Sequence, residues 1–394
     1  MKFLLITEQF PPLVGGAAFH LYNLYSRMGS HEVAVYTMKR PGSEEFDKKQ
    51  KIKISRHWIW EKSFSLLHPT SIIGPFWLLC GVIRQIFKQK PDILHCGTVH
   101  PSGECALIIK KFFGMPYIVY TFAEEIGHFN RSRLKRFIIA KVLRNAEAVI
   151  SICDYTVNML VGLGVEREKI FKIPPGVDLK EFRADKDAVT KEQLGLEGKV
   201  VLLTVARLAE RKNHQVVLRA LPRVLEEFPN CAYVITGSGP TEKKLRMLIE
   251  ELGLKQQVIF TGEIPLGEIH NYYNLADIFI MVNREIPERG DVEGFALVFL
   301  EAAAFKKPVI GGRSGGVIES VEDGSTGILI NDPLDPDEVA AAILKLLRDK
   351  ELAATMGKRA RARVEKSFGW DKFKDKIIAL NENIMASRKR DAPQ

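Results

Sequence analysis

The sequence predicts an α/β protein with two domains, each built around a parallel β-sheet. Short apolar runs that suit buried strands alternate with segments of helical period along most of the chain. Residues 174–198 interrupt this alternation with proline, glycine and charge, and they separate two similar series of runs. The chain has 394 residues, 46% of them hydrophobic, which is enough for two separate cores.

The first series of apolar runs precedes the interruption and defines an N-terminal domain at residues 1–178. Its expected strands are KFLLIT, EVAVYT, DILHC, YIVYTF and AEAVISI. The first run is too short for a signal peptide and has the composition of a β-strand. We therefore expect a cytoplasmic protein.

The second series follows the interruption and defines a C-terminal domain at residues 179–369. Its expected strands are KVVLLTVAR, AYVITGSG, QVIFTG, ADIFIMV, KPVIGG and TGILI. Two such halves would leave a cleft between them, and open parallel sheets bind their ligands at the carboxyl ends of the strands. We therefore expect the functional residues in the loops that follow these runs.

The potential metal ligands show no metal-binding pattern. The five cysteines are scattered and include no CxxC pair, which argues against a disulfide framework and a zinc ribbon. The DPD triplet at 335–337 precedes a helix pattern, so we interpret Asp335 or Asp337 as a helix N-cap. His95, Cys96, His100 and Glu104 lie close in sequence but lack a recognised ligand spacing. We expect no metal ion.

Residues 131–144 form a basic segment that accounts for part of the formal charge of +9, with six Lys or Arg residues and no acidic one. Its apolar residues follow helical spacing. Two interpretations stay open: a core helix with a solvated outer face, or attachment to an anionic membrane surface through Arg133, Lys135 and Arg136. Nucleic acid is disfavoured, because no aromatic-interleaved basic motif is present.

Glycines recur where the expected strands end, at Gly15–Gly16, Gly237, Gly294 and Gly311–Gly312. Each glycine alone is weak evidence for a ligand, since tight turns also need glycine. Their recurrence at strand ends is more informative, because backbone amides in such turns, together with helix N-termini, attract phosphate oxygens.

Four charged residues of the second domain suggest a nucleotide sugar as the ligand. Arg207 and Lys212 follow a strand and could neutralise a diphosphate. Glu293 precedes an apolar helix pattern and Glu301 lies within it, which at about 1.5 Å per residue separates their carboxylates by about 12 Å. Two carboxylates acting on one bond would lie within about 5 to 10 Å, so a hydrolase is disfavoured.

These motifs together resemble glycosyltransferase family 4 over essentially the whole chain. The resemblance rests on the paired glycines at 15–16, IPPGVDLKEF, VARL with Lys212, VITGSGP, EGFALVFLEAAA, KPVIGG, SGGVIESVEDGSTGILI and SFGWDKF. REIPERGDVEGFALVFLEAAA is similar in particular to the branch of phosphatidylinositol mannosyltransferase-like enzymes. The resemblance implies the GT-B fold, with two Rossmann-like domains facing each other across a cleft and residues 370–394 packing back on the first.

The resemblance also implies a retaining hexosyltransferase that uses a GDP- or UDP-sugar of the mannose or glucose type and needs no cofactor. The implied acceptor is lipid-linked or a cell-envelope glycan. The implied catalytic residues are Arg207 and Lys212 on the donor diphosphate and Glu293 on the transferred sugar. The other implied donor-binding residues are Gly16, Gly237, Ile264, Gly294, Phe295, Leu297, Val298 and Glu301, and those on the acceptor side are Gly15, His100 and Glu124.

One position departs from the family pattern. Phe122 stands where the family commonly has a histidine that contacts the 6-hydroxyl of the sugar. Either the donor sugar is held differently at that carbon, or the site is weakened, or the matching register is shifted. A nucleotide-sugar epimerase or phosphorylase on a related fold and a membrane-surface binding module remain as alternatives. A dinucleotide dehydrogenase is poorly supported, because the first strand end lacks G-x-G-x-x-G.

Overall fold

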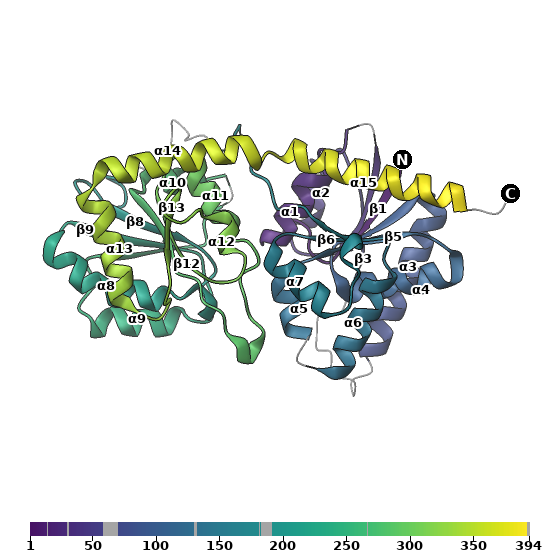
Figure 1. Cartoon of the computed structure of the whole chain (residues 1–394), viewed down its shortest axis with the longest axis horizontal. Coiled ribbons are helices and arrows are strands. Elements are labelled where there is room, and N and C mark those ends of the chain that lie inside the picture. The colour runs from purple at the N-terminus through teal and green to yellow at the C-terminus, as the bar shows by residue number, and fades with distance from the viewer. Residues whose placement is uncertain are drawn as a thin grey trace. The chain divides into compact units, whose positions relative to one another are not determined.

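The computed structural model describes residues 1–13, 15–29, 31–57, 70–129, 132–180, 182, 191–265 and 267–391. The chain folds into two compact units (Figure 1). The first unit comprises Met1–Pro175 together with Trp370–Gln394, and the second comprises Gly176–Gly369. Each unit is a parallel sheet covered by helices, which confirms the predicted fold class.

The sheet of the first unit has the strand order β3-β2-β1-β4-β5-β6-β7, and all its pairs are parallel. The order reverses between β1 and β4, so the loops after these strands diverge. The central strands read as unbroken apolar runs because helices cover both faces. The strands are β1 (Lys2–Ile6), β2 (Glu32–Met38), β3 (Lys53–His57), β4 (Ile93–Cys96), β5 (Tyr117–Thr121), β6 (Ala148–Ser151) and β7 (Ile170–Lys172).

Helices on one face of this sheet share a single core with the strands, which includes Leu78, Cys105, Ile139 and Leu160. These helices are α3 (Thr70–Gln89), α4 (Glu104–Phe113), α6 (Arg133–Asn145) and α7 (Asp154–Gly162). The remaining helical elements of the unit are α1 (Gly16–Tyr25), α2 (Ser43–Lys48), α5 (Ala123–Phe129), α15 (Trp370–Asp391), and the short turns η1 (Val99–Gly103) and η2 (Arg167–Lys169).

The C-terminal helix α15 packs against α1 and belongs to the first unit. Asn381 of this helix is fully buried, and its Oδ1 lies 3.0 Å from Nε2 of His95 on β4. His95 is also buried, and burial lowers its pKa to about 3, so the ring is neutral. A satisfied pair of polar groups therefore fixes the register of α15 on the sheet.

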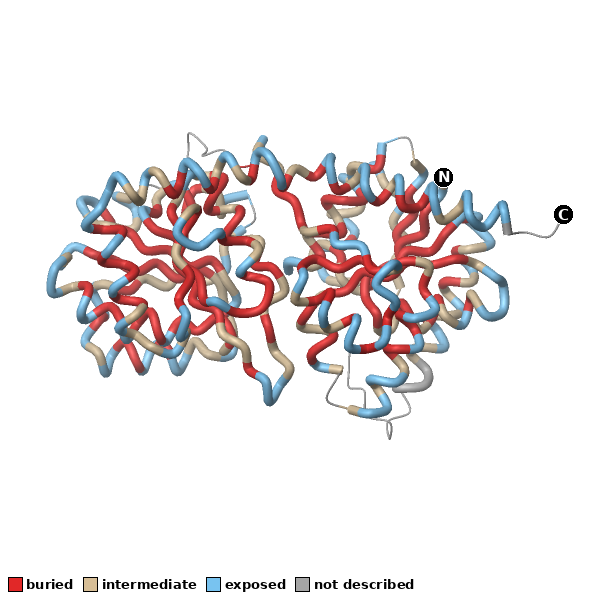
Figure 2. The backbone as a smooth tube through the Cα atoms, viewed as in Figure 1, coloured by how far each residue is buried: buried red, intermediate tan, exposed pale blue. Residues whose placement is uncertain are grey.

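The second unit has the strand order β10-β9-β8-β11-β12-β13, again with all pairs parallel. Its order reverses between β8 and β11. All six predicted strands are present, and the buried strands and exposed outer helix faces stand out in Figure 2. They are β8 (Val200–Val205), β9 (Cys231–Thr236), β10 (Val258–Gly262), β11 (Ile278–Met281), β12 (Val309–Gly312) and β13 (Gly327–Ile330).

Side chains of β8 alternate between two cores, with Leu202 in one and Val201 and Leu203 in the other. One core is closed by α8 (His214–Glu227), α9 (Glu242–Glu251) and α13 (Pro336–Arg348). The other is closed by α10 (Ile269–Leu275), α11 (Leu297–Ala304) and α12 (Val317–Ser320). The remaining elements are α14 (Lys350–Ser367), which packs on α11 and α13, and the turns η3 (Glu210–Lys212) and η4 (Pro287–Arg289).

Candidate active site

The candidate site lies at the carboxyl ends of β8 and β11 in the second unit. These strands are neighbours, and the strand order reverses between them, which is where open parallel sheets bind ligands. The loop after β8 carries Arg207 and leads into η3, which contains Lys212. The loop after β11 carries Glu293 and leads into α11. Sheet topology therefore brings together residues about 80 positions apart in the chain.

Three side chains donate hydrogen bonds to one oxygen of Glu293. Lys212 Nζ lies 2.5 Å from Glu293 Oε2, Arg211 Nε 3.3 Å and Asn283 Nδ2 3.3 Å. The side chains of Lys212 and Glu293 are only 11% and 12% exposed. Burial alone would raise the pKa of Glu293, but Lys212 and Arg211 outweigh it and hold the pKa below its ordinary value. Glu293 is therefore a carboxylate at neutral pH.

Arg211, which the sequence reasoning missed, is the buried cation beside this pair. Its Nη1 lies 3.0 Å from Asp291 Oδ1 while its Nε reaches Glu293, so it bridges two carboxylates of the loop before α11. Asn283, fully buried, was also missed. The only available signal was the position of Arg211 next to Lys212, in a charged stretch that resembles ordinary surface.

Arg207 is exposed on the loop after β8. Burial lowers the pKa of Lys212, and the positive charges of Arg211 and Arg207 lower it further, while Glu293 opposes the shift. Arg207 therefore lies close enough to add to the positive potential of the cluster. The structure thus pairs Lys212 with Glu293 and places Arg207 on the loop that leads to Lys212.

The segment before α11 is shaped by backbone conformation. Ala296 has the left-handed values φ 57° and ψ 72°, and no side chain caps the helix that starts at Leu297. The first amides of the helix, which include Leu297 and Val298, have no acceptor within the helix and carry the positive end of its dipole. Gly294 and Phe295 lie in the turn between Glu293 and this helix end.

A glycine loop after β12 supports the backbone of Glu293. Gly316 N donates to the carbonyl oxygen of Glu293 at 2.9 Å, and Gly315 N donates to Glu285 Oε1 at 3.1 Å. A Cβ atom on Gly315, whose φ is +53°, would lie 2.3 Å from the Glu293 oxygen. Gly315 is therefore required by this close approach.

Glu301 lies on α11 and accepts a hydrogen bond from the Tyr273 hydroxyl at 2.5 Å. Burial raises the pKa of Glu301, and the hydrogen bond from Tyr273 partly offsets the rise. Tyr273, which is fully buried on α10, was missed by the sequence reasoning. The pair holds the carboxyl group in one orientation.

Gly237 and Ile264 lie at the ends of β9 and β10. Gly237 has φ +104°, and a Cβ atom there would lie 2.2 Å from the carbonyl oxygen of Ala206. This glycine therefore lets the end of β9 approach the loop that carries Arg207. Ile264 is partly buried against the core that α10 and α11 close.

The other predicted residues lie in the first unit. Gly15 and Gly16 precede and begin α1, and a Cβ atom on either would meet open space. His100 Nδ1 lies 3.0 Å from Glu104 Oε1. Glu124 is partly buried in the first turn of α5. These assignments stay predictions.

Glu125, the neighbour of Glu124, holds the loop after β4. Its Oε1 accepts the backbone N–H groups of Val99 at 2.7 Å and His100 at 3.0 Å. Phe122 follows β5, and its ring lies edge-on to the buried ring of His20, with 6.2 Å between centroids. A histidine thus lies beside Phe122, although it comes from α1, and the sequence reasoning did not identify it.

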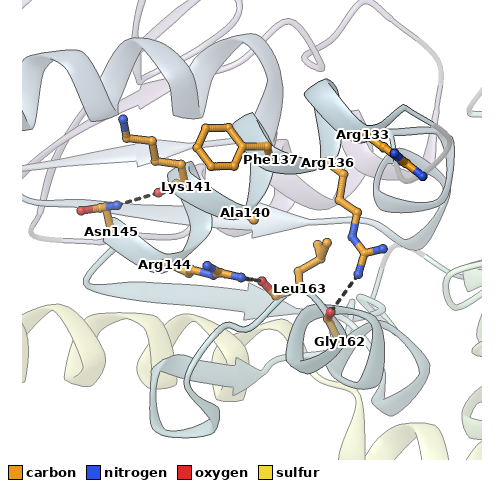
Figure 3. Close-up of a pocket in the computed structure, with 9 residues that line it drawn as sticks. All are labelled: Arg133, Arg136, Phe137, Ala140, Lys141, Arg144, Asn145, Gly162 and Leu163. Atoms are coloured by element: carbon orange, nitrogen blue, oxygen red, sulfur yellow. Dashed lines mark hydrogen bonds between the residues drawn. The ribbon is translucent and has the colours of Figure 1, made fainter.

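The three residues predicted to face a membrane lie on α6. Arg133 and Arg136 are exposed (Figure 3), whereas Lys135 is partly buried with its ammonium 5.8 Å from the centre of the Phe129 ring. Among the helices of the described residues, none combines the length and apolar character needed to cross a membrane. Residues 63–83 include no Asp, Glu, Lys or Arg, and residues 63–69 of this stretch lie outside the described residues.

No group of three or more His, Cys, Asp or Glu side chains within the described ranges is arranged to hold a metal ion. Asp335 is the N-cap of α13, because its Oδ1 accepts the backbone N–H of Asp337 at 2.8 Å. The interpretation of the DPD triplet as a helix cap is therefore confirmed.

Two parallel-sheet units, one with charged side chains clustered at the carboxyl ends of its central strands, have the architecture of two-domain α/β enzymes that bind their ligands at those strand ends. Comparison with known families identifies the group. Residues 14–181 match Glycosyltransferase Family 4, and residues 186–363 match Glycosyl transferases group 1. The chain belongs to glycosyltransferase family 4.

The similar curated proteins include two mannosyltransferases. The GDP-mannose-dependent alpha-(1-6)-phosphatidylinositol monomannoside mannosyltransferase of Mycolicibacterium smegmatis is 30% identical, over 90% of this chain and 91% of its own. The Mycobacterium tuberculosis protein of the same name is 28% identical, over 98% and 100% of the two chains. Anabaena HepE, solved with UDP and glucose, superposes with a TM-score of 0.81 at 20% identity, covering 97% and 100% of the two chains. This likeness confirms the GT-B fold.

Proposed function

We propose that this glycosyltransferase transfers a mannosyl residue from GDP-mannose to a phosphatidylinositol-type glycolipid, with retention of the anomeric configuration. The proposal takes its donor and acceptor from the two mannosyltransferases, which align with nearly the whole chain. The observation that carries it is the convergence of Lys212, Arg211 and Asn283 on Glu293 at the strand ends of the second unit.

The cations account for the chemistry of the leaving group. Departure of GDP builds negative charge on the diphosphate while the sugar becomes oxocarbenium-like. Lys212 uses one of its three N–H donors on Glu293, which leaves two for phosphate oxygens. Arg207 and the amides of Leu297 and Val298 supply further positive potential, and such preorganised donors stabilise the developing charge.

The carboxylates account for orientation of the donor. Glu293 accepts hydrogen bonds from the hydroxyl groups of the transferred sugar, with the backbone of Gly294 and Phe295 beside it. Glu301, oriented by Tyr273, accepts from the hydroxyl groups of the ribose. Neither acts as a nucleophile in this proposal. The acceptor attacks the face that GDP leaves, and a phosphate oxygen of the donor takes its proton.

Ligand-induced stabilisation tests the donor. A ligand at about 100 times its Kd adds about 2.7 kcal/mol of apparent stability, so GDP and GDP-mannose should raise Tm more than UDP, ADP and their sugars. Preference for UDP-glucose would overturn the choice of donor. If no nucleoside diphosphate raises Tm, the assignment of the site is wrong.

Transfer itself tests the acceptor and the stereochemistry. Incubation with GDP-mannose should give a mannosylated lipid when phosphatidylinositol mannoside is present, and NMR of the product should show an α-linkage. A β-linkage, or an intermediate trapped on Glu293, would contradict retention by same-face attack. Product formation without acceptor, or dependence on free phosphate, would instead favour an epimerase or a phosphorylase.

A further inference from the structure

Exposed apolar side chains gather on three neighbouring helices of the first unit. Of the thirteen large apolar residues that are exposed in the described part of the chain, eight lie on α3, α4 and α6. These helices cover the same face of the sheet, and α4 contacts both α3 and α6. The eight are Phe76, Trp77, Phe87, Ile108, Phe112, Phe113, Leu134 and Phe137. We call them the apolar patch.

The patch lies on the outward side of helices that already have a buried side. On α3, Leu78 and Val82 face the core, while Trp77 is 66% exposed. On α4, Ile109 is buried and Phe112 is 74% exposed. Packing against the sheet therefore does not explain the outward aromatic residues, and a concentration of this kind marks an interaction surface.

The charge on these helices is almost entirely positive. Together α3, α4 and α6 carry nine Lys or Arg residues and a single acidic residue, Glu104. Glu104 is partly buried and lies 3.0 Å from His100. The outward surface therefore combines large aromatic groups with an excess of positive charge, although Lys110 is paired with Glu147.

A groove beside the patch concentrates part of this charge. It has a volume of about 550 Å³ and lies between α6 and the end of α7 (Figure 3). Arg136 and Arg144 donate to the carbonyl oxygens of Gly162 and Leu163, at 3.3 and 2.6 Å. These two arginines neutralise the C-terminal end of α7.

Arg133 and Lys141 lie at opposite ends of the groove with Phe137 between them (Figure 3). Neither forms an ion pair or a side-chain hydrogen bond with any residue that the structure describes. Their charges are thus available to an anion, and the ring of the adjacent Phe137 is 66% exposed.

We propose that the face formed by α3, α4 and α6 docks on the surface of an anionic phospholipid bilayer. The aromatic residues of the apolar patch enter the boundary between headgroups and acyl chains. Arg133 and Lys141 contact lipid phosphates in the groove. Exposed aromatic residues on helices that also carry several Lys and Arg residues are typical of interfacial membrane anchors. A second copy of the chain fits less well, since it would bring two strongly positive faces together.

Vesicle co-sedimentation of the full chain tests this docking face. Wild-type protein should bind vesicles of equimolar phosphatidylcholine and phosphatidylglycerol, bind phosphatidylcholine vesicles far less, and lose binding as salt is raised. The double variant Arg133→Glu/Lys141→Glu should bind the anionic vesicles at least about tenfold more weakly. Its matched control is Lys243→Glu/Lys244→Glu, which reverses two exposed charges on α9 of the second unit.

A second pair of variants tests the contribution of the aromatic residues to vesicle binding. Phe112→Ser/Phe137→Ser should weaken vesicle binding, whereas Met247→Ser/Ile318→Ser, exposed apolar residues of the second unit, should not. Equal binding by both members of either pair, or equal binding to neutral and anionic vesicles, would overturn the proposal. A dimer in sedimentation velocity that the patch variants dissociate would overturn it in favour of self-association.

The proposed docking face and the proposed donor site can be tested separately. All four variants should keep the GDP-induced rise in Tm, because none alters the second-unit cluster around Glu293. A variant that loses this rise has lost its fold, and single variants Phe137→Ser and Lys141→Glu then replace the doubles. Loss of vesicle binding with an intact GDP response would confirm the membrane role of this face.

Discussion

Lys212 and Glu293 form an ion pair of 2.5 Å between the loops that follow β8 and β11. The pair therefore links the two loops on either side of the reversal of strand order. An almost buried lysine and carboxylate are stable there only as partners, because either charge alone would lack compensation.

Replacing Lys212 removes a donor to the departing diphosphate. We predict that Lys212→Gln lowers the rate of sugar transfer by about 100- to 1,000-fold and weakens the binding of GDP and GDP-mannose alike. The control is Lys243→Gln, an exposed residue of α9. Steady-state kinetics together with calorimetric GDP affinities give both quantities.

Glu293→Gln should behave differently, because Glu293 is assigned to the sugar. We predict that it lowers transfer far more than it weakens GDP binding, since the amide still occupies the space but Lys212 loses the carboxylate that supports its charge. Equal loss of GDP affinity in both variants would mean that Glu293 acts only by holding Lys212.

Arg211 is predicted to position Glu293 through its second contact, with Asp291. The variants Arg211→Gln and Asp291→Asn and their combination form a double-mutant cycle, and we expect a coupling of about 1 to 3 kcal/mol in unfolding free energy. Arg211→Gln should also raise KM for the donor, whereas Arg211→Lys should restore part of it. Additive effects of the two substitutions would contradict the bridging role.

Tyr273 is predicted to tune the titration of Glu301. Burial raises the pKa of Glu301 above its ordinary value of 4.5, and the Tyr273 hydroxyl opposes the shift, so Tyr273→Phe should raise the pKa further. Because the pKa of Glu301 is higher in the folded protein, its protonated carboxyl group contributes fully to the free energy of unfolding below pH 4.5. This contribution is lost as the pH rises through the folded-state pKa.

The same shift should appear in ligand binding. If the charged carboxylate accepts from ribose hydroxyls, GDP affinity should increase with pH through the pKa of Glu301, and this increase should move to higher pH in Tyr273→Phe. Calorimetric titrations over the range from pH 4.5 to neutrality measure it. An unchanged pH profile would separate Glu301 from the nucleotide.

The interior strands of both sheets and the edge strands β10 and β13 of the second sheet were predictable from sequence, whereas the edge strands of the first sheet were not. β1, β4, β5 and β6 are buried on both faces and read as apolar runs. β3, with the sequence KISRH, and the three-residue β7 lie at the two edges of the first sheet, where little side-chain surface is buried. Neither has the apolar pattern on which the predictions depended.

Residues of the candidate site were predictable from sequence only where they belong to a recognisable motif. Lys212 and Glu293 were identified from their motifs, but Arg211 resembled a surface charge because its partner Asp291 lies 80 residues away in the chain. The role of Tyr273 could not be predicted from sequence for the same reason, since its hydrogen bond to Glu301 joins two different helices. Such contacts depend on sheet topology, and no local pattern encodes them.

Gly315 is predicted to be irreplaceable because of a contact and not only because of its backbone angle. In Gly315→Ala the new Cβ would lie 2.3 Å from the carbonyl oxygen of Glu293 and displace the segment before α11. Gly324 offers a matched control, since its φ of +71° is also left-handed while its Cβ position is open. In both alanine variants the left-handed conformation should lower the free energy of unfolding by about 1 to 2 kcal/mol, as measured by denaturant unfolding. Only Gly315→Ala should also lower the transfer rate, by about tenfold or more, and equal rates in the two variants would show that the glycine loop does not position Glu293.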